Sequence, residues 1–469
     1  MVIQEARGRV VAGTFFHAPS RGVIEVLEDA LLSIDERGAI TAVALRNDPD
    51  YRRMRDEAAT AGKLESLPRG CYVLPGFVDL HIHAPQYPQL GKALDCPLED
   101  WLERYTFPLE ARYADLAFAR RAYAMLVADL AANGTTTAVM YGTIHEEPNR
   151  LLVEICLERG LRAFIGKVAM DNPETCPEHY RDASPEAALA GTQAFIDYVR
   201  RRSGDHGLVR PVVTPRFIPS CTDATLEGLA AIGRASGCHV QTHCSESDWQ
   251  HRYAFERYGR SDAESLDRLG LMSRVTLLAH APLLSPQDMD LVVSRGSAIA
   301  HCPLSNVYFG NAVFPLKAAL AKGMRIGLGS DVSGGPSASM FDAVRMSVAA
   351  SRLLDDGVDP ALPPERRGRP GSRIDWRTAF FLATAGGGDA LGLPVGRFVV
   401  GNAFDALIVD TRIDDGGIRI FEEIDTLEDV LAKILYTASR RDIVGVFVAG
   451  RALCREQGRP SDRDPFERP

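Results

Sequence analysis

The chain has 469 residues, of which 46% are hydrophobic and 25% are charged, and its formal net charge is −9. This composition is typical of a globular protein, and an acidic balance without a Lys/Arg-rich run argues against nucleic acid as a partner. The longest apolar runs fall well short of the roughly 20 residues that a helix needs to span a bilayer, which argues against a membrane partner.

Both ends of the chain carry short, β-like pieces. They lie at residues 9–12, 24–28, 30–34 and 40–45 and return at residues 404–410 and 443–449. We expect segments 1–70 and 391–455 to pair into one small β-sandwich domain beside a larger domain, residues 71–390. The last residues, 456–469, are rich in Arg, Asp and Pro and have little to bury, so the sequence predicts a mobile tail there.

Between these ends, apolar strand candidates alternate with amphipathic segments. The strand candidates are residues 72–83, 135–143, 162–170, 210–217, 239–246, 275–281, 297–303 and 325–331. The helix-like segments are residues 109–132, 149–159, 185–202, 224–236, 286–295 and 314–322. Eight such units predict an α/β fold, a closed (β/α)8 TIM barrel. The alternative is an open doubly wound sheet, but no Gly-x-Gly-x-x-Gly sequence follows the first strand. A Pro-rich stretch, residues 359–370, is predicted to be a surface loop.

The first strand candidate ends in His81-Ile82-His83. Side chains two residues apart on a strand point to the same face, and their Cα atoms lie roughly 6.5–7 Å apart. Both imidazole rings can therefore bind one metal ion, at Zn–N distances of about 2.0–2.1 Å. His-x-His alone is weak evidence, because a sheet face can carry two histidines for no catalytic reason.

Polar side chains also stand at the ends of later strand candidates. Arg216 ends the fourth, His243 is near the end of the fifth, His280 ends the sixth and Asp331 ends the eighth. In a parallel barrel the carboxyl ends of all strands meet at one mouth, where active sites form. Asp331 alone could instead cap a helix N-terminus. With four histidines expected at the same level, a metal is the better partner for this carboxylate.

His81, His83, His243 and Asp331 make up a set of three imidazoles and one carboxylate. This set suits Zn²⁺, and Fe²⁺ and Mn²⁺ remain open from ligand type alone. Water bound to such an ion titrates near neutral pH and becomes a hydroxide nucleophile. Lys167, in the third strand candidate, would bridge a second metal if it were carboxylated. We favour a single metal and a Lys167 paired with a buried carboxylate.

Three catalytic residues are predicted to handle protons. His280 and Asp331 are placed to orient the water and to accept its proton. Glu246 follows His243 by three residues and is placed to carry a proton to the substrate. The alternative for Glu246 is a carboxylate in the first turn of a helix, where the macrodipole favours negative charge.

The remaining histidines and the cysteines are assigned no chemistry. His239 is expected at the base of the fifth strand and His301 in the barrel wall. Nine cysteines are scattered without a Cys-x-x-Cys pair. An odd, dispersed set indicates reduced thiols in a cytoplasmic protein. The start of the chain, residues 1–8, lacks the pattern of a signal peptide, which agrees with that interpretation.

Taken together, the segments that carry these residues resemble a known family. They are residues 81–87, 97–108, 133–137, 214–217, 242–246, 300–306 and 327–331, and they extend over most of residues 70–395. With the barrel and the split β domain, they resemble the amidohydrolase superfamily and, within it, the guanine deaminase branch. Gln86-Tyr87 and the segment that contains Arg216-Phe217 separate this branch from general cytosine and adenosine deaminases.

The resemblance implies a zinc-dependent hydrolase, with one zinc ion per chain, that converts guanine to xanthine and ammonia. It implies that Glu246 protonates the ring nitrogen beside the attacked carbon. It also implies that Gln86, Arg216 and the backbone at Phe217 read the edge of the purine substrate. The alternative for Arg216 is a structural ion pair at a strand end. The assembly that the resemblance implies is a homodimer.

Two positions depart from the family's pattern and leave the exact substrate open. Ala281-Pro282 follows His280 where the family usually has a glycine, and Leu304 replaces a usually small or polar residue. One rival hypothesis is therefore a deaminase of an 8-oxopurine, a pterin or an aminotriazine on the same fold. A second rival is a barrel without activity that serves as an interaction module. The retained metal and proton-transfer residues argue against the second.

Overall fold

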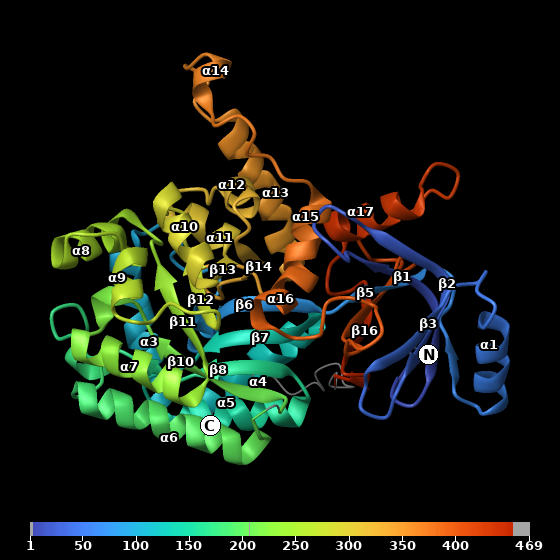
Figure 1. Ribbon diagram of the computed structural model, residues 1–469, viewed down its shortest axis with the longest axis horizontal. Coiled ribbons are helices and arrows are strands. Elements are labelled where there is room, and N and C mark those ends of the chain that lie inside the picture. The colour runs from blue at the N-terminus through green and yellow to red at the C-terminus, as the bar shows by residue number, and fades with distance from the viewer. Residues whose placement is uncertain (1–2, 206, 454–469) are drawn as a thin grey trace.

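The computed structural model describes residues 3–205 and 207–453 and consists of a parallel barrel beside a mixed sheet (Figure 1). The predicted mobile tail, residues 456–469, lies outside the described residues. No helix in the described part is long and apolar enough to cross a membrane.

In the described part of the chain, the barrel contains eight consecutive parallel strands, as the sequence predicts. They are β6 (Phe77–His83), β7 (Thr135–Tyr141), β8 (Arg162–Gly166), β10 (Val209–Pro215), β11 (His239–Cys244), β12 (Thr276–His280), β13 (Ala298–His301) and β14 (Arg325–Leu328). Backbone hydrogen bonds close the barrel between its last and first strands. The Asp331 amide donates to the His81 carbonyl at 2.9 Å, and the His83 amide donates to the Val332 carbonyl at 2.8 Å. The open doubly wound sheet is therefore excluded.

Helices surround the barrel (Figure 1). They include α4 (Leu116–Ala132), α5 (Glu146–Arg159), α6 (Pro185–Ser203), α7 (Asp223–Ser236), α8 (Asp248–Tyr258), α9 (Asp262–Arg268), α10 (Pro286–Arg295), α12 (Leu316–Ala321) and α13 (Met340–Asp356). The helix predicted from residue 109 begins later, because the Asp115 side chain accepts from the amides of Ala117 and Phe118 and caps α4. Residues 109–111 belong instead to the short helix α3 (Phe107–Ala111). Within the predicted loop 359–370, a single helical turn, α14 (Pro364–Arg367), lies at the tip of a projection beyond α13.

The strand predicted over residues 72–83 is in fact two strands in two different sheets. β5 (Cys71–Pro75) pairs with strands of the mixed sheet, and the barrel begins only at Phe77. The Gly76 amide donates to the Asp405 carbonyl at 3.0 Å, whereas the next amide, that of Phe77, donates to Gly134 in the barrel. A Cβ atom at Gly76 would lie 2.2 Å from the Thr136 side chain, so the crossing requires glycine. The strand predicted over residues 162–170 is likewise divided, into β8 and β9 (Val168–Ala169).

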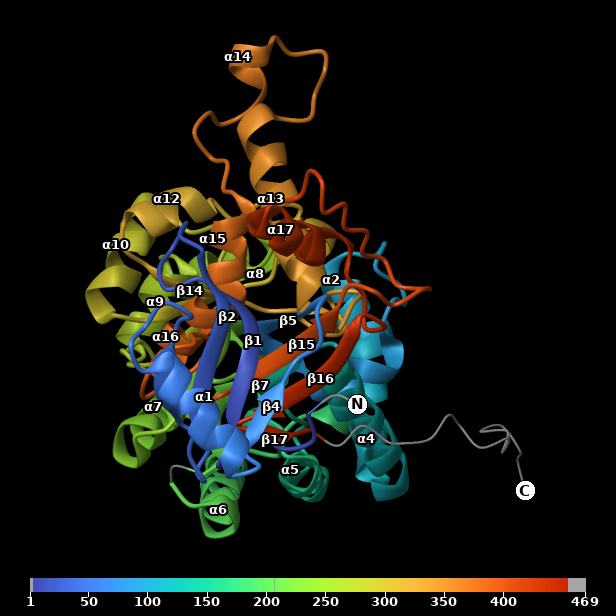
Figure 2. The ribbon, with the colours of Figure 1, turned by 90° about the vertical axis from the view of Figure 1, so that its right-hand side faces the viewer.

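The two ends of the chain form one mixed sheet. Its described strands run in the order β17 (Arg451–Ala452), β16 (Ile443–Val448), β15 (Ala406–Asp410), β5, β1 (Val10–His17), β2 (Glu25–Ile34) and β3 (Ile40–Ala44), and β4 (Leu64–Ser66) pairs with β1. The expected small β domain is therefore a single continuous sheet in the residues described, not two separate facing sheets. Helix α1 (Tyr51–Thr60) covers one end of it, and α17 (Leu427–Thr437) lies at another edge (Figure 2).

Apolar side chains fill the barrel interior below its mouth. They come from alternate positions of the strands, among them Leu80, Val139, Phe164 and Leu277. Leu391 and Leu393 belong to the same cluster and complete it from the segment around α16 (Gly387–Leu391). The base of the barrel is thus a packed core, and polar chemistry is confined to the other end.

A buried ion pair joins the barrel to the mixed sheet. Arg162, at the start of β8, pairs with Asp405, whose carboxylate also accepts from the Ala449 amide at 2.7 Å.

We expect Asp405→Ala to lower the free energy of unfolding by about 3–5 kcal/mol, because it leaves a largely buried guanidinium without its partner. The apparent unfolding temperature at a fixed scan rate measures this. Arg46→Met, which removes an exposed pair with Asp29, is the control and should change it little. Equal stability of the two variants would contradict the prediction.

Candidate active site

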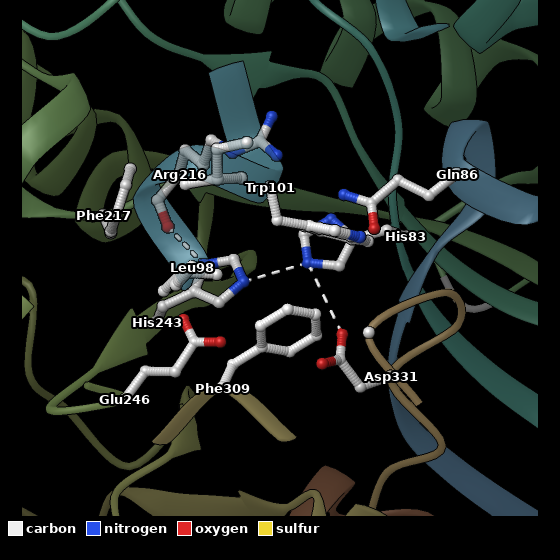
Figure 3. A pocket seen from close by; sticks show the side chains of 12 residues that line it. His83, Gln86, Leu98, Trp101, Arg216, Phe217, His243, Glu246, Phe309 and Asp331 are labelled. Carbon is white, nitrogen blue, oxygen red and sulfur yellow. Dashed lines mark hydrogen bonds and ion pairs between the residues drawn. The ribbon is translucent and has the colours of Figure 1, made fainter. Parts of the chain in front are cut away.

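A cavity opens at the carboxyl end of the barrel strands (Figure 3). Its lining combines charged and polar groups with apolar and aromatic side chains: His83, Gln86, Leu98, Trp101, Leu102, Arg216, Phe217, His243, Glu246, Phe309, Asp331 and Gly334. A partly apolar cavity with a few convergent polar groups is typical of a small-molecule site.

The four predicted metal ligands meet at this cavity. The Nε2 atoms of His83 and His243 lie 2.9 Å apart, and the Asp331 Oδ1 atom lies 3.2 Å from His81 Nε2 and 3.7 Å from His83 Nε2. Ligand atoms of the three histidines all fall within 4.8 Å of one another. Strand geometry and burial thus bring three imidazoles and a carboxylate to one point. That donor set fits a divalent metal ion.

The protonation states also fit a metal. Burial, reinforced by the neighbouring His81, lowers the pKa of both His83 and His243 well below the usual histidine value. Both rings are therefore neutral at pH 7, which is the form that binds a metal. Burial is the largest single influence and raises the pKa of Asp331, but the combined effect of His81, His280 and Ser305 outweighs it and the pKa is lowered. The carboxylate stays ionised.

Neighbouring groups fix the orientation of the candidate ligands. The His243 Nδ1–H donates to the Arg216 carbonyl at 2.6 Å, which directs its Nε2 lone pair toward His83. The Asp79 carboxylate accepts from the amides of His81 at 3.2 Å and Ser330 at 2.9 Å, and so links the ends of β6 and β14. Burial raises the pKa of Asp79 to about 6.

Glu246 and His280 stand on the far side of the ligand cluster. The Glu246 Oε1 atom lies 3.6 Å from His280 Nε2, which is 3.9 Å from Asp331 Oδ2. His280 Nδ1 bonds the Asn306 Oδ1 atom at 3.0 Å, so Nδ1 carries the proton and Nε2 faces the site as an acceptor. Burial lowers the pKa of His280 to about 4 and, together with the charge of Asp331, raises that of Glu246 well above its usual value.

The structure decides two alternatives that the sequence leaves open. Helix α8 begins at Asp248 and is capped by Ser247, so Glu246 precedes the helix and is not a first-turn residue. No helix begins at Asp331 either, because the next helix among the described residues is α13, at Met340. The backbone at Asp331 instead has a left-handed φ of 50°, and the backbone at His280 has a φ of 73°. Such backbone conformations are costly outside glycine and cluster at functional sites.

Gln86 and Arg216 line the cavity opposite these groups. Gln86 belongs to η1 (Ala84–Gln89), directly after β6, and Arg216 and Phe217 follow β10. Both Arg216 Nη atoms also bond Glu110, at 2.7 and 3.1 Å. The ion pair given as the alternative for Arg216 is therefore present, and the same side chain also lines the cavity.

Sequence reasoning missed Glu110 and the apolar wall of the cavity. That wall comes from α2 (Leu98–Trp101), the π-helical turn η2 (Leu102–Thr106) and a second π-helical turn, η6 (Asn306–Gly310). The rings of Trp101 and Phe309 pack with their centroids 4.9 Å apart. Segment 97–108 is one of the motifs that carry the family resemblance, and its aromatic residues, which follow the first barrel strand in the sequence, are the signal that points to the cavity.

The other assignments from the sequence agree with the structure. Lys167 pairs with Asp182, whose side chain is 8% exposed, at 2.8 Å. His239 packs on Phe164 away from the mouth, with ring centroids 5.1 Å apart. His301 is buried in the barrel wall and does not line the cavity. The eight cysteines of the described residues are all free thiols.

The two departures from the family's pattern lie outside the cavity lining. Ala281 has a left-handed φ of 64°, the conformation that the usual glycine adopts at least cost. Leu304 sits in the short helix α11 (Pro303–Ser305), beside the wall rather than in it. Neither position changes a group that faces the cavity.

The chain matches the amidohydrolase family over residues 72–453. It belongs to the amidohydrolase family. The probable guanine deaminase of Schizosaccharomyces pombe is 36% identical over 455 residues, with 95% of this chain and 83% of that protein covered. The guanine deaminase of Mus musculus is 35% identical over 453 residues, with 95% of this chain and 96% of that protein covered. The crystal structure of guanine deaminase from C. acetobutylicum with bound guanine has a TM-score of 0.84 and 27% identity, with 95% of this chain and 100% of that chain covered. Within the amidohydrolases, this chain groups with the guanine deaminases.

Gln250, on α8, holds the loop that carries His243 and Glu246 in this amidohydrolase. Its Nε2 atom donates to the His243 carbonyl at 3.3 Å and to Asp262 at 2.5 Å, and its Oε1 atom accepts from the Glu246 amide at 3.3 Å.

We expect Gln250→Leu to weaken binding of a divalent metal by about 10- to 100-fold, since the loop loses the hydrogen bonds that hold it. Competition with a chelator measures the affinity.

The exposed Gln193→Leu variant, on α6, controls for the substitution itself and should bind metal like the wild type. Unchanged metal affinity in Gln250→Leu would show that the loop holds its shape without this residue.

Proposed function

We propose that this protein is a zinc-dependent guanine deaminase that hydrolyses guanine to xanthine and ammonia. The observation that carries the proposal is the set of side chains that meet at one cavity. Three imidazoles and the Asp331 carboxylate meet there, and a buried acid, Glu246, stands beside them. Gln86 and Arg216 supply further polar groups to its lining. The membership of the chain among the guanine deaminases supports the choice of substrate.

His81, His83, His243 and Asp331 would hold one zinc ion per chain. When bound, zinc lowers the pKa of a coordinated water and makes hydroxide available at neutral pH. Lys167 is engaged with Asp182, outside the cavity, which supports a single metal. In the overall reaction the oxygen of water bonds to C2 of guanine, and the amino group at C2 leaves as ammonia.

The chain's own residues would move the protons. His280 presents an unprotonated Nε2 atom and can accept a proton, since its other nitrogen is bonded to Asn306. Burial keeps the pKa of Glu246 high, so this side chain can hold a proton and deliver it to the ring nitrogen beside C2. Asp331 stays ionised and faces both groups. Gln86 and Arg216 would orient the purine.

We also propose a cytoplasmic homodimer. The free thiols of all eight described cysteines support a reducing compartment. The dimer rests on analogy with the family.

The proposed function is tested by ammonia release from guanine, with elemental analysis of the same sample. We expect release from guanine to exceed that from 8-oxopurines, pterins and aminotriazines, and zinc to be present at about one equivalent per chain. Preference for another heterocycle would leave the proposed roles of the site residues in place but would contradict guanine as the substrate. Two metals per active chain, or a carboxylated Lys167, would overturn the mononuclear proposal.

Glu246→Gln tests the proton carrier. The amide keeps the shape of the side chain but cannot deliver a proton, so kcat should fall by about 10²–10⁴-fold while bound metal is retained. Steady-state kinetics on metal-replete protein give the comparison. Glu264→Gln, at an exposed position in α9, is the matched control and should leave kcat unchanged. Near-normal turnover in Glu246→Gln would assign proton delivery to another group.

A further inference from the structure

Glu110 is a carboxylate buried directly behind the cavity wall. It lies in α3, is 0% exposed, and does not itself line the cavity. Its Oε1 atom accepts from Gln86 Nε2 at 2.9 Å and from Arg216 Nη2 at 3.1 Å, and its Oε2 atom accepts from Arg216 Nη1 at 2.7 Å. One carboxylate therefore holds both polar side chains that face the proposed purine.

The first consequence concerns orientation. A glutamine amide can turn by 180° and exchange its donor and acceptor ends. Because an ionised carboxylate only accepts, Gln86 must turn its NH2 group to Glu110, and its Oε1 atom then faces the Ser333 amide at 3.4 Å. Arg216 is fixed in the same way by its two-pronged pair with Glu110. The ring of Phe107, from the same helix, lies 5.1 Å from the guanidinium.

The second consequence concerns charge. Arg216 is 2% exposed, and Glu110 compensates its positive charge within the protein. The wall therefore offers oriented N–H donors without a net positive charge. A neutral heterocycle can use such donors fully, whereas an anion would need uncompensated positive charge to offset its loss of water.

We infer that Glu110 is a positioning residue that presets Gln86 and Arg216 and makes this wall selective for neutral purine bases over anionic ones. The inference rests on the proposed function for the identity of substrate and product. Xanthine ionises more readily than guanine, so the same wall that receives guanine holds the anionic form of the product weakly. Glu110 thereby favours release of the product without touching it.

Glu110→Gln is the test, because it removes the charge and keeps the size of the side chain. We expect KM for guanine to rise by about 10- to 100-fold, the effect of losing hydrogen bonds to a charged group, with a smaller change in kcat. We also expect inhibition by xanthine to strengthen relative to inhibition by hypoxanthine, at a pH where xanthine is largely anionic and hypoxanthine is neutral. The ratio of the two Ki values separates the charge effect from a general loosening of the site.

Two further variants serve as controls. Glu103→Gln makes the same change at an exposed carboxylate of the neighbouring turn η2 and should leave KM and the Ki ratio unchanged. In a Gln86→Leu background, Glu110→Gln should raise KM by a smaller factor than it does alone, since one of its two partners is already gone.

An unchanged KM and an unchanged Ki ratio in Glu110→Gln would overturn the inference. So would an equal loss of affinity for every ligand, which is the mark of a purely structural residue. If Glu110→Gln does not fold, Glu110→Asp replaces it: the shorter side chain keeps the charge but cannot reach both partners, so KM must still rise. A wild-type KM in Glu110→Asp would then overturn the inference.

Failure of the proposed function can be distinguished from failure of this inference. If the wild-type enzyme releases no ammonia from guanine, the proposed function is wrong. Calorimetric binding of hypoxanthine and xanthine to the metal-loaded wild type and to Glu110→Gln still measures the ratio of affinities. An increase in relative affinity for xanthine in the variant supports the role of Glu110, and an unchanged ratio overturns it.

Discussion

The closing seam of the barrel is the constraint on which the site depends. The first and last strands are held together by backbone hydrogen bonds between residues that are themselves candidate metal ligands or their neighbours. The Asp331 amide bonds the His81 carbonyl, and the Asp79 carboxylate bonds amides on both sides of the seam. Three of the four candidate ligands therefore take their relative positions from the same contacts that close the fold. A shift in strand register at this seam would therefore have two effects at once: it would open the barrel and it would move the candidate metal ligands apart.

Burial then sets the chemistry of these groups. In a dry site a neutral imidazole is favoured over an imidazolium, and an isolated carboxylic acid over a carboxylate. The pKa values of His83, His243 and His280 fall accordingly, and that of Glu246 rises. Asp331 is the exception, because His81 stabilises its charge. A single physical cause thus favours the neutral forms of the candidate metal-binding histidines and of the candidate proton carrier, while the neighbours of Asp331 keep its carboxylate ionised.

Much of this could be predicted from the sequence, because strand ends in a parallel barrel converge whatever the details of packing. Period-two spacing put His81 and His83 on one face, and the same reasoning placed His243, His280 and Asp331 at the mouth. Glu110 could not be found in this way. It lies in a short helix whose local pattern carries no chemical signal, and its partners are 24 and 106 residues away. The division of the first predicted strand was also hidden, since an apolar run looks the same whether it serves one sheet or two.

The crossing at Gly76 has a mechanical consequence. The amides of two successive residues are bonded to different sheets, so no slack chain separates the mixed sheet from the strand that carries His81 and His83. The position of β6 is therefore tied to that of β5, because no loop separates the two strands at this point. A displacement of β5 would have to be accommodated within β6 itself, the strand that ends in His81 and His83.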